Sequence, residues 1–279
     1  MSNTSNSLNK NKIRAVMKIR YINLERSPDR RAHIERLLDE QGVAEISERF
    51  AGIVAAKPFK GLALSVTGCL MSHLALINTL QQSETIVILE DDACFSKNFS
   101  NIIPNIPSLI DEANLDVIFL GQTVAFNDSA LHAQLIKFMG ELRASDKYRI
   151  LNADTFYRYG TFGYVINKKS VSKIKKLIAA LDLTRDAKPI DSLMSQWIKT
   201  KKLSAGVMFP NLVGVESSFE TMMYDRSHSL NHRLHCELVN IYLNDRAEDV
   251  VTEWHNILGA NPNPDALAIC KIMYARLTQ

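Results

Sequence analysis

Three consecutive carboxylates, Glu90, Asp91 and Asp92, directly follow an apolar run at residues 85–89. The β-branched residues of that run are typical of a parallel strand that is covered on both faces. Ligand crevices in open α/β sheets lie at the carboxyl ends of such strands. Hard divalent cations such as Mg²⁺ or Mn²⁺ take oxygen ligands and can bridge the phosphates of a nucleotide, offsetting the charge on a departing diphosphate. The triplet therefore indicates a metal and nucleotide site, or else a solvated acidic turn.

Two further side chains could take part in the chemistry. Asp191 follows Pro189 at the expected start of a helix, where the helix field favours an ionised carboxylate that can serve as a general base. The same position also suits a simple helix cap. His73 follows Ser72 on the helix before the acidic strand, so it can orient a carboxylate or a ligand. A buried, hydrogen-bonded structural histidine is the alternative.

Polar and small residues also follow the expected strands. Asn23 and Arg26 come after the first strand, where side chains reach a ligand at the sheet edge. Arg30 and Arg31 begin the next helix, and a solvated helix start explains them equally well. Three glycines permit close approach of the backbone to a ligand, although each can instead serve a turn. They are Gly121, Gly160 and Gly163.

The elements that must position these residues alternate between strands and helices. Strands are predicted over residues 16–24, 85–89, 117–120 and 162–166. Helices are predicted over 28–41, with Ser27 as cap, over 67–81, with Thr67 as cap, over 168–181, and after Pro189. This alternation predicts an α/β fold with an open, mostly parallel sheet flanked by helices. Residues 127–159 look polar and irregular, which favours an active-site flap or acceptor loop.

The character of the chain changes near residue 230. Three helical stretches are expected over residues 231–244, 246–258 and 265–277. We therefore predict a flexible N-terminus over residues 1–12, a main domain over 13–229 and a C-terminal helical tail over 230–279. The amphipathic tail is a candidate for contacts between subunits or with a membrane surface.

Composition limits the classes of function. The 33 Lys and Arg against 30 Asp and Glu do not suggest a nucleic-acid binder. With 46% hydrophobic and 23% charged residues the chain is typical of a globular protein. No apolar run approaches the ~20 residues of a membrane-spanning helix, and residues 1–11 do not resemble a signal peptide. We expect a cytoplasmic protein whose membrane contact is peripheral. The cysteines, which lack metal-site spacing and are expected to be reduced, are Cys69, Cys94, Cys236 and Cys270.

Five segments occur in a characteristic order along the chain. Their ordered combination is far more specific than any one of them. They are Asn23-Leu24-Glu25-Arg26-Ser27-Pro28-Asp29-Arg30-Arg31, Gly68-Cys69-Leu70-Met71-Ser72-His73, Leu89-Glu90-Asp91-Asp92, Gly160-Thr161-Phe162-Gly163-Tyr164 and Pro189-Ile190-Asp191. Together, over residues 16–225, they resemble glycosyltransferase family 25, the lipooligosaccharide biosynthesis glycosyltransferases. The resemblance implies a GT-A-type, Rossmann-like fold, a UDP-sugar donor, most often UDP-galactose, and inversion at the anomeric carbon.

The resemblance also implies roles for individual residues. Asp92 is implied as the main ligand of Mn²⁺ or Mg²⁺. Glu90, which stands where the family pattern has Asp, is placed at the metal, at a metal-bound water or at the ribose. Asp191 is implied as the catalytic base. The residues implied to bind the donor are Asn23, Arg26, Glu90, Asp91, Gly121, Thr161 and Gly163, and Asp225 and His228 are candidates for a late metal or diphosphate contact.

These observations favour an inverting transfer of a hexose, galactose in the first instance, from UDP-galactose to a lipooligosaccharide or another bacterial surface glycan. A metal-dependent nucleotidyltransferase would also combine carboxylates with a nucleotide, although the sequence lacks a clear Gly-rich phosphate loop of that kind. A non-catalytic sugar-binding or scaffold protein of the same fold is the other alternative. Retention of the three carboxylates and Asp191 argues against it.

Overall fold

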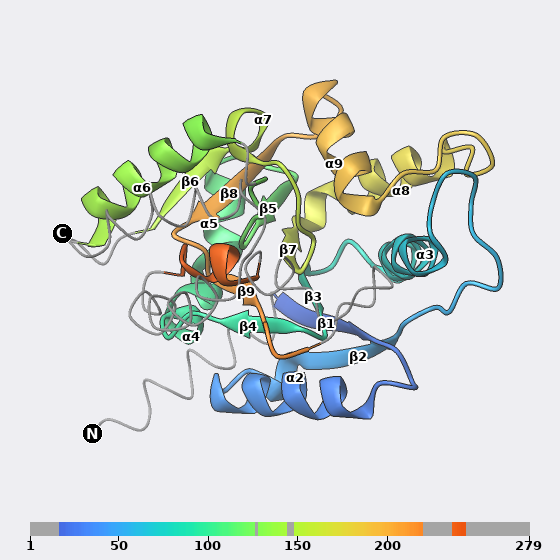
Figure 1. The fold of residues 1–279 in the computed structure, drawn as a ribbon, viewed down its shortest axis with the longest axis horizontal. Coiled ribbons are helices and arrows are strands. Elements are labelled where there is room, and N and C mark those ends of the chain that lie inside the picture. The colour runs from blue at the N-terminus through green and yellow to red at the C-terminus, as the bar shows by residue number, and fades with distance from the viewer. Residues whose placement is uncertain (1–16, 126–127, 144–147, 220–235, 244–279) are drawn as a thin grey trace, which may run out of the picture.

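The computed structural model describes residues 17–125, 128–143, 148–219 and 236–243 (Figure 1). Its centre is a seven-stranded sheet in the order β2-β1-β3-β7-β5-β8-β6. The strands are β1 (Met17–Asn23), β2 (Ser47–Ala51), β3 (Thr85–Glu90), β5 (Val117–Phe119), β6 (Arg149–Asn152), β7 (Gly163–Ile166) and β8 (Ala205–Phe209). A two-stranded sheet pairs β4 (Ala93–Phe95) with β9 (Val213–Val215).

The direction of the strands is mixed. β1 pairs in parallel with β2 and β3, and β5 pairs in parallel with β8. β7 lies antiparallel between β3 and β5, and β6 is antiparallel to β8 at the edge. Most strands therefore share one direction, as predicted, and the structure is α/β with a Rossmann-like sheet. The insertion of β7 could not be read from the sequence, because its apolar run resembles that of the parallel strands.

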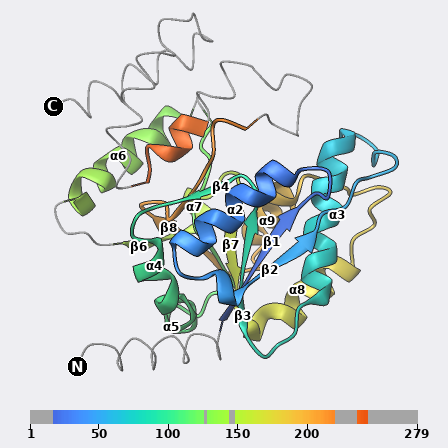
Figure 2. The same ribbon diagram turned by 90° about the horizontal axis from the view of Figure 1, so that it is seen from below.

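Helices cover both faces of this sheet (Figures 1 and 2). On one face lie α3 (Leu64–Thr79), α8 (Val171–Ala179) and α9 (Ile190–Lys199), and on the other lie α2 (Pro28–Glu40), α4 (Phe99–Ile102) and α5 (Ile106–Glu112). Strand β3 supplies both cores, since Ile86 and Ile88 pack on the first face whereas Val87 and Leu89 pack on the second. This two-sided burial explains its unbroken apolar run and fixes its carboxyl end as a rigid platform.

Two predicted helix caps are wrong in their chemistry. Ser27 stands at the N-cap position of α2, but its side chain makes no capping hydrogen bond. Thr67 lies inside α3, which begins earlier, and its hydroxyl donates to Ala63 O and accepts from the backbone N–H of Phe59. Both helices form because their apolar faces are buried, so the missing caps cost little.

The prediction of an irregular segment at residues 127–159 is also wrong. This stretch contains α6 (Ser129–Arg143), β6 and α7 (Ala153–Phe156). The buried apolar residues of α6 recur at helical spacing, at Leu131, Leu135, Met139 and Leu142. Polar residues between them hid a periodicity that places one apolar stripe against the domain.

Of the predicted helical tail, the structure describes residues 236–243, and all of them are buried. They pack beside α6 in a third apolar cluster (Figure 2). Asn240 donates to Val215 O (2.8 Å) and accepts from Val215 N–H (3.0 Å), so this segment is joined to β9. The remainder of the tail and the predicted flexible N-terminus lie outside the described residues. Among the helices that the structure describes, none is long and apolar enough to cross a membrane.

We expect Asn240→Ala to lower the free energy of unfolding by about 2 kcal/mol or more, because it leaves both polar groups of the Val215 backbone without their partner. Denaturant unfolding followed by circular dichroism measures the change. Asn105→Ala, which makes the same substitution at an exposed position, is the matched control and should change stability little. Equal effects of the two variants would contradict the docking of this segment.

Candidate functional site

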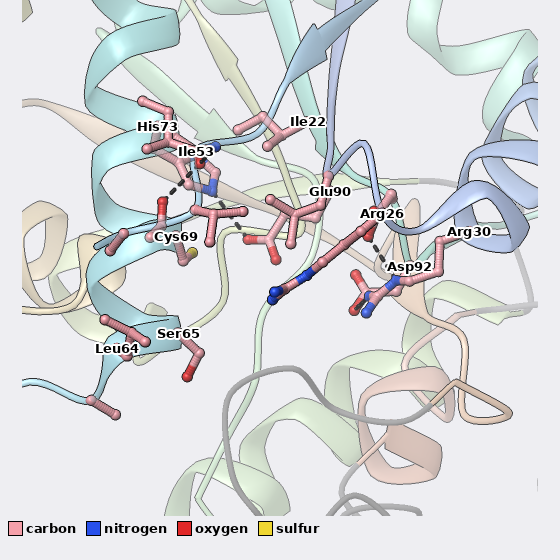
Figure 3. A pocket seen from close by; sticks show the side chains of 17 residues that line it. Ile22, Arg26, Arg30, Ile53, Leu64, Ser65, Cys69, His73, Glu90 and Asp92 are labelled. Carbon is pink, nitrogen blue, oxygen red and sulfur yellow. Dashed lines mark hydrogen bonds and ion pairs between the residues drawn. The ribbon is translucent and has the colours of Figure 1, made fainter. Parts of the chain in front are cut away.

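A cavity of about 590 Å³ opens at the carboxyl ends of β1 and β3, beside the first half of α3 (Figure 3). One part of its wall is apolar and comes from Leu24, the loop after β2, and the start of α3. The other part carries charges. The charged and titratable side chains among its lining residues are Arg26, Arg30, Cys69, His73, Glu90, Asp91 and Asp92. The strand ends therefore collect predicted site residues that lie far apart in the sequence.

Arg30 links two of the three carboxylates. Its Nε lies 2.8 Å from Asp91 Oδ1, and its Nη2 donates to Asp92 Oδ2. Arg30 is buried, and its guanidinium lies over the ring of Phe219, 5.4 Å from the centroid. The solvated helix start is therefore wrong for Arg30. It holds for Arg31, which is exposed and pairs with Glu35.

Asp91 is held from its other side as well. Asn23 Nδ2 donates to Asp91 Oδ2 over 2.8 Å, and Arg49 Nε donates to Asn23 Oδ1 over 3.0 Å. Both oxygens of Asp91 are thus engaged by protein groups. The sequence left Arg30 open between a site role and a solvated helix start and gave no signal for Arg49. Arg30 joins α2 to a turn far along the chain, and Arg49 reaches Asp91 only through Asn23.

Asp92 differs from its neighbour in having one free oxygen. Its Oδ1 is buried and has no hydrogen-bond partner among the described residues. Such an orphaned carboxylate oxygen is costly unless a ligand completes it. Because Asp92 lines the cavity and its other oxygen is fixed by Arg30, the donor set fits a hard divalent cation that takes oxygen ligands.

Glu90 is oriented by two neighbours. Thr161 Oγ1 donates to Glu90 Oε1 over 2.9 Å, and His73 Nε2 lies 3.3 Å from the same oxygen. The other ring nitrogen, His73 Nδ1, lies 3.0 Å from the hydroxyl of Tyr164. His73 is almost completely buried, so it is a structural histidine and orients a carboxylate, which combines the two predicted alternatives.

The three carboxyl groups have different pKa values. Burial raises the pKa of Asp91 to about 6, against the opposing charge of Arg30. Burial also raises the pKa of Asp92, again opposed by Arg30 and reinforced by the charge of Glu90. Burial would raise the pKa of Glu90 too, but His73, Thr161 and Arg30 together hold it below its usual range. Glu90 is therefore the carboxyl group whose ionised form is most favoured. A bound cation would favour the ionised forms of the two aspartates as well.

The segment around Ser72 builds the cavity wall. Ser72 Oγ accepts from Ile53 N–H and donates to Gly68 O, both over 2.7 Å. A Cβ at Gly68 would lie 2.8 Å from Ile53 O, so only glycine lets the loop after β2 approach α3 this closely. The close contact holds Ile53 at the edge of the cavity. The part of α3 that it touches also carries Cys69 and His73.

Arg26 and the two predicted donor-binding glycines are placed differently. Arg26 is exposed, extends into the cavity and forms no ion pair with a described residue (Figure 3). A Cβ at Gly121 would lie 2.1 Å from Val213 O, and one at Gly163 would lie 2.9 Å from the Val213 side chain. Packing against β9 thus already requires these glycines, and their contact with a donor stays a prediction.

Asp191 lies in the first turn of α9, where its Oδ1 accepts from Ser192 N–H over 2.6 Å. Burial raises its pKa, and the charge of Glu90 adds to this, whereas the amides of Ser192 and Gly160 act in the opposite direction. The amide at the helix start thus favours the ionised form, as expected, but burial outweighs it. The raised pKa makes Asp191 a stronger base than an exposed aspartate. Asp225 and His228 lie outside the described residues.

Comparison with known proteins identifies the family of this chain. The family model described as glycosyltransferase family 25 (LPS biosynthesis protein) matches residues 44–194, more than half of the chain. The site belongs to a Rossmann-like glycosyltransferase, and the chain is a member of glycosyltransferase family 25.

Two relatives support this assignment. A Drosophila melanogaster protein named glycosyltransferase 25 family member is 27% identical over 199 residues, which cover 62% of this chain and 28% of that protein. A protein of Acanthamoeba polyphaga mimivirus, named as a candidate glycosyltransferase, is 27% identical over 170 residues, which cover 55% of this chain and 51% of that protein. The chain thus spans about half of one relative and less of the other.

The pKa of Asp91 yields a prediction about stability. Its ordinary value is 3.8 and its folded value about 6, so between these values the folded state holds a proton that the unfolded state has lost. The stability that this proton provides is present below pH 3.8 and is lost as the pH rises through about 6. In the presence of a chelator, the free energy of unfolding of the wild type relative to Asp91→Asn should therefore fall by about 2.4 kcal/mol from pH 4 to pH 7. Denaturant unfolding at both pH values measures it, and a constant or rising difference would contradict the pKa.

Proposed function

We propose that this chain is an inverting, metal-dependent glycosyltransferase that moves a hexose, galactose in the first instance, from UDP-galactose to a lipooligosaccharide or another bacterial surface glycan. One observation carries the proposal: a buried oxygen of Asp92 and the guanidinium of Arg26, neither of which has a partner among the described residues, line the same cavity. Membership of family 25 supports the transfer of a sugar. Its description as an LPS biosynthesis protein supports the class of acceptor, and galactose rests on the resemblance of the sequence motifs.

The cavity suits a nucleotide with a charged and an uncharged end. Its volume lies within the range of ~300–1,000 Å³ that is typical of small-molecule sites. Leu24, Ile53 and Val54 offer an apolar wall to a nucleoside, and Arg26 offers hydrogen-bond donors to phosphate oxygens. Glu90, held by its contacts with His73 and Thr161, would accept a hydrogen bond from a ribose hydroxyl or from water.

When bound, a divalent cation would supply positive charge against the negative charge that develops as UDP leaves. Asp92 would hold this cation through Oδ1, since Arg30 already occupies Oδ2. Arg30 and Asn23 keep Asp91 ordered beside it. The two aspartates then need little rearrangement to receive the charge of the donor complex.

Inversion requires a base on the acceptor side. In our proposal Asp191 takes the proton from the acceptor hydroxyl while that oxygen forms the new bond to the anomeric carbon and the bond to UDP breaks. Asp191 is close enough to Glu90 for the two charges to interact, and burial raises its pKa. Both features suit a carboxylate that accepts a proton beside the donor site.

The most direct test is a donor screen with Mn²⁺ in which UDP release is measured for UDP-galactose, UDP-glucose and other UDP-sugars. The expected result is UDP release that disappears in chelator, followed by transfer of the preferred sugar to a component of a surface-glycan extract. NMR of the product gives the anomeric configuration. Pyrophosphate release from a nucleoside triphosphate would favour a nucleotidyltransferase, and binding without turnover would favour a scaffold.

Asp191→Asn should lower the turnover number by roughly 10²- to 10⁴-fold while UDP affinity barely changes, because the amide keeps the size of the side chain but cannot take a proton. Transfer kinetics and calorimetric UDP binding measure the two effects. Asp186→Asn, at an exposed position before the same helix, is the control and should behave like the wild type. Ordinary turnover of Asp191→Asn would place the base elsewhere, and loss of UDP binding in a folded variant would move Asp191 to the donor site.

A further inference from the structure

Cys69, His73 and Glu90 bring three different ligand atoms together at the cavity. Their Sγ, ring nitrogen and carboxylate oxygen all lie within 4.8 Å of one another. Cys69 and His73 are four residues apart on α3 and so share one face of the helix, and Glu90 ends the neighbouring strand β3. All three line the cavity, in which Figure 3 shows the sulfur and the carboxylate on the side that α3 and β3 share.

The histidine is oriented as a ligand would be. Its Nδ1 lies 3.0 Å from the Tyr164 hydroxyl, and the two rings stack. Its Nε2 is buried, forms no hydrogen bond within the described part of the chain, and lies 3.3 Å from Glu90 Oε1. In metal sites a ligating histidine characteristically has its second ring nitrogen held by a polar group, which fixes the ring and the tautomer.

The mixed sulfur, nitrogen and oxygen set selects a different ion from the one proposed at Asp92. Mn²⁺ and Mg²⁺ favour oxygen ligands, whereas Zn²⁺ binds Cys, His and carboxylate together with bonds of about 2.0–2.3 Å. Tetrahedral bonds of that length separate the ligand atoms by about 3.3–3.6 Å. The nitrogen and oxygen are already 3.3 Å apart, so a rotamer-scale shift of Cys69 closes the set.

We propose that Cys69 Sγ, His73 Nε2 and the Glu90 carboxylate form a second metal site that binds one Zn²⁺ or Co²⁺ ion. Three protein ligands leave the fourth position open toward the cavity. The thiol of Cys69 releases its proton to solvent as the bond from sulfur to metal forms, so each ion bound releases one proton from this residue. Among the described residues no other group of His, Cys, Asp and Glu side chains converges in this way.

Occupation of this site has a consequence for the donor that rests on the proposed function. Zn²⁺ would withdraw Glu90 from its contact with a ribose hydroxyl or water and would add a ligand shell inside the cavity. The ion would therefore compete with the UDP-sugar, and Zn²⁺ would inhibit an enzyme that Mn²⁺ activates. Binding of Zn²⁺ or Co²⁺ at this site would therefore control the access of the donor to the cavity.

Titration of the chelator-treated full chain with Co²⁺ tests the site without any assay of activity. We expect one equivalent of tetrahedral Co²⁺, seen as intense visible bands with a thiolate-to-metal band in the near ultraviolet, and complete displacement of these bands by Zn²⁺. Cys69→Ser, which retains the other three cysteines, should remove the thiolate band and weaken Co²⁺ binding by more than about 100-fold, beyond the usual effect of a residue outside the ligand set. Asp92→Asn is the matched control and should keep the band. A thiolate band that persists in folded Cys69→Ser, or is absent from the wild type, overturns the site.

A second arm separates this inference from the proposed function. With Mn²⁺ saturating, Zn²⁺ should raise the apparent dissociation constant of UDP at least tenfold in the wild type and much less in Cys69→Ser. If the Co²⁺ bands appear as expected but Zn²⁺ does not change the affinity for UDP, the metal site is supported and its control of the donor cavity is overturned. If UDP does not bind with Mn²⁺ at all, the proposed function fails, whereas the Co²⁺ spectrum still decides the metal site.

Discussion

The pairing of Arg30 with Asp91 and Asp92 is the interaction on which the site depends. Burial at the end of a strand raises the pKa values of both carboxyl groups, and neighbouring negative charges raise them further, since Glu90 acts on both and Asp92 acts on Asp91. The guanidinium of Arg30 contacts both of them, because Arg30 lies in the first turn of α2, which begins beside the turn that follows β3. Removal of one partner from such a buried pair typically costs about 3–5 kcal/mol. The arginine thus allows the chain to keep a concentrated negative charge in the fold.

Helix α3 supplies the other half of the site from a single run of residues. Gly68 admits the loop after β2, Ser72 fastens that loop at Ile53, and His73 fixes the carboxylate of Glu90. Cys69 faces the cavity from the same turn. Because one helix holds the loop after β2, carries Cys69 and orients Glu90, a change in the packing of α3 would affect all three together. This arrangement explains why the segment around Ser72 and the acidic turn belong to one functional unit.

The sequence predicted the elements with strong periodicity and the turn that carries the acidic side chains. Strand β3 and helix α9 were predicted because their apolar patterns reflect burial. Helix α6 was missed, since its stripe is interrupted by polar residues that face away from the core. Arg49 gave no signal, and Arg30 could not be distinguished from a solvated helix start, because the role of each is set by packing between distant segments. The pKa of Asp191 likewise depends on burial and on Glu90, neither of which is encoded by its local helix position.

The central claim is that the free oxygen of Asp92 holds the ion through which a nucleoside diphosphate binds. Calorimetry of UDP binding, in Mn²⁺ and in chelator, tests it most directly with wild type, Asp92→Asn and the exposed control Asp39→Asn. The account predicts that Mn²⁺ strengthens UDP binding by at least about tenfold in wild type and control, equivalent to about 1.4 kcal/mol, and has no effect in Asp92→Asn. An equal dependence on Mn²⁺ in folded Asp92→Asn would contradict the claim.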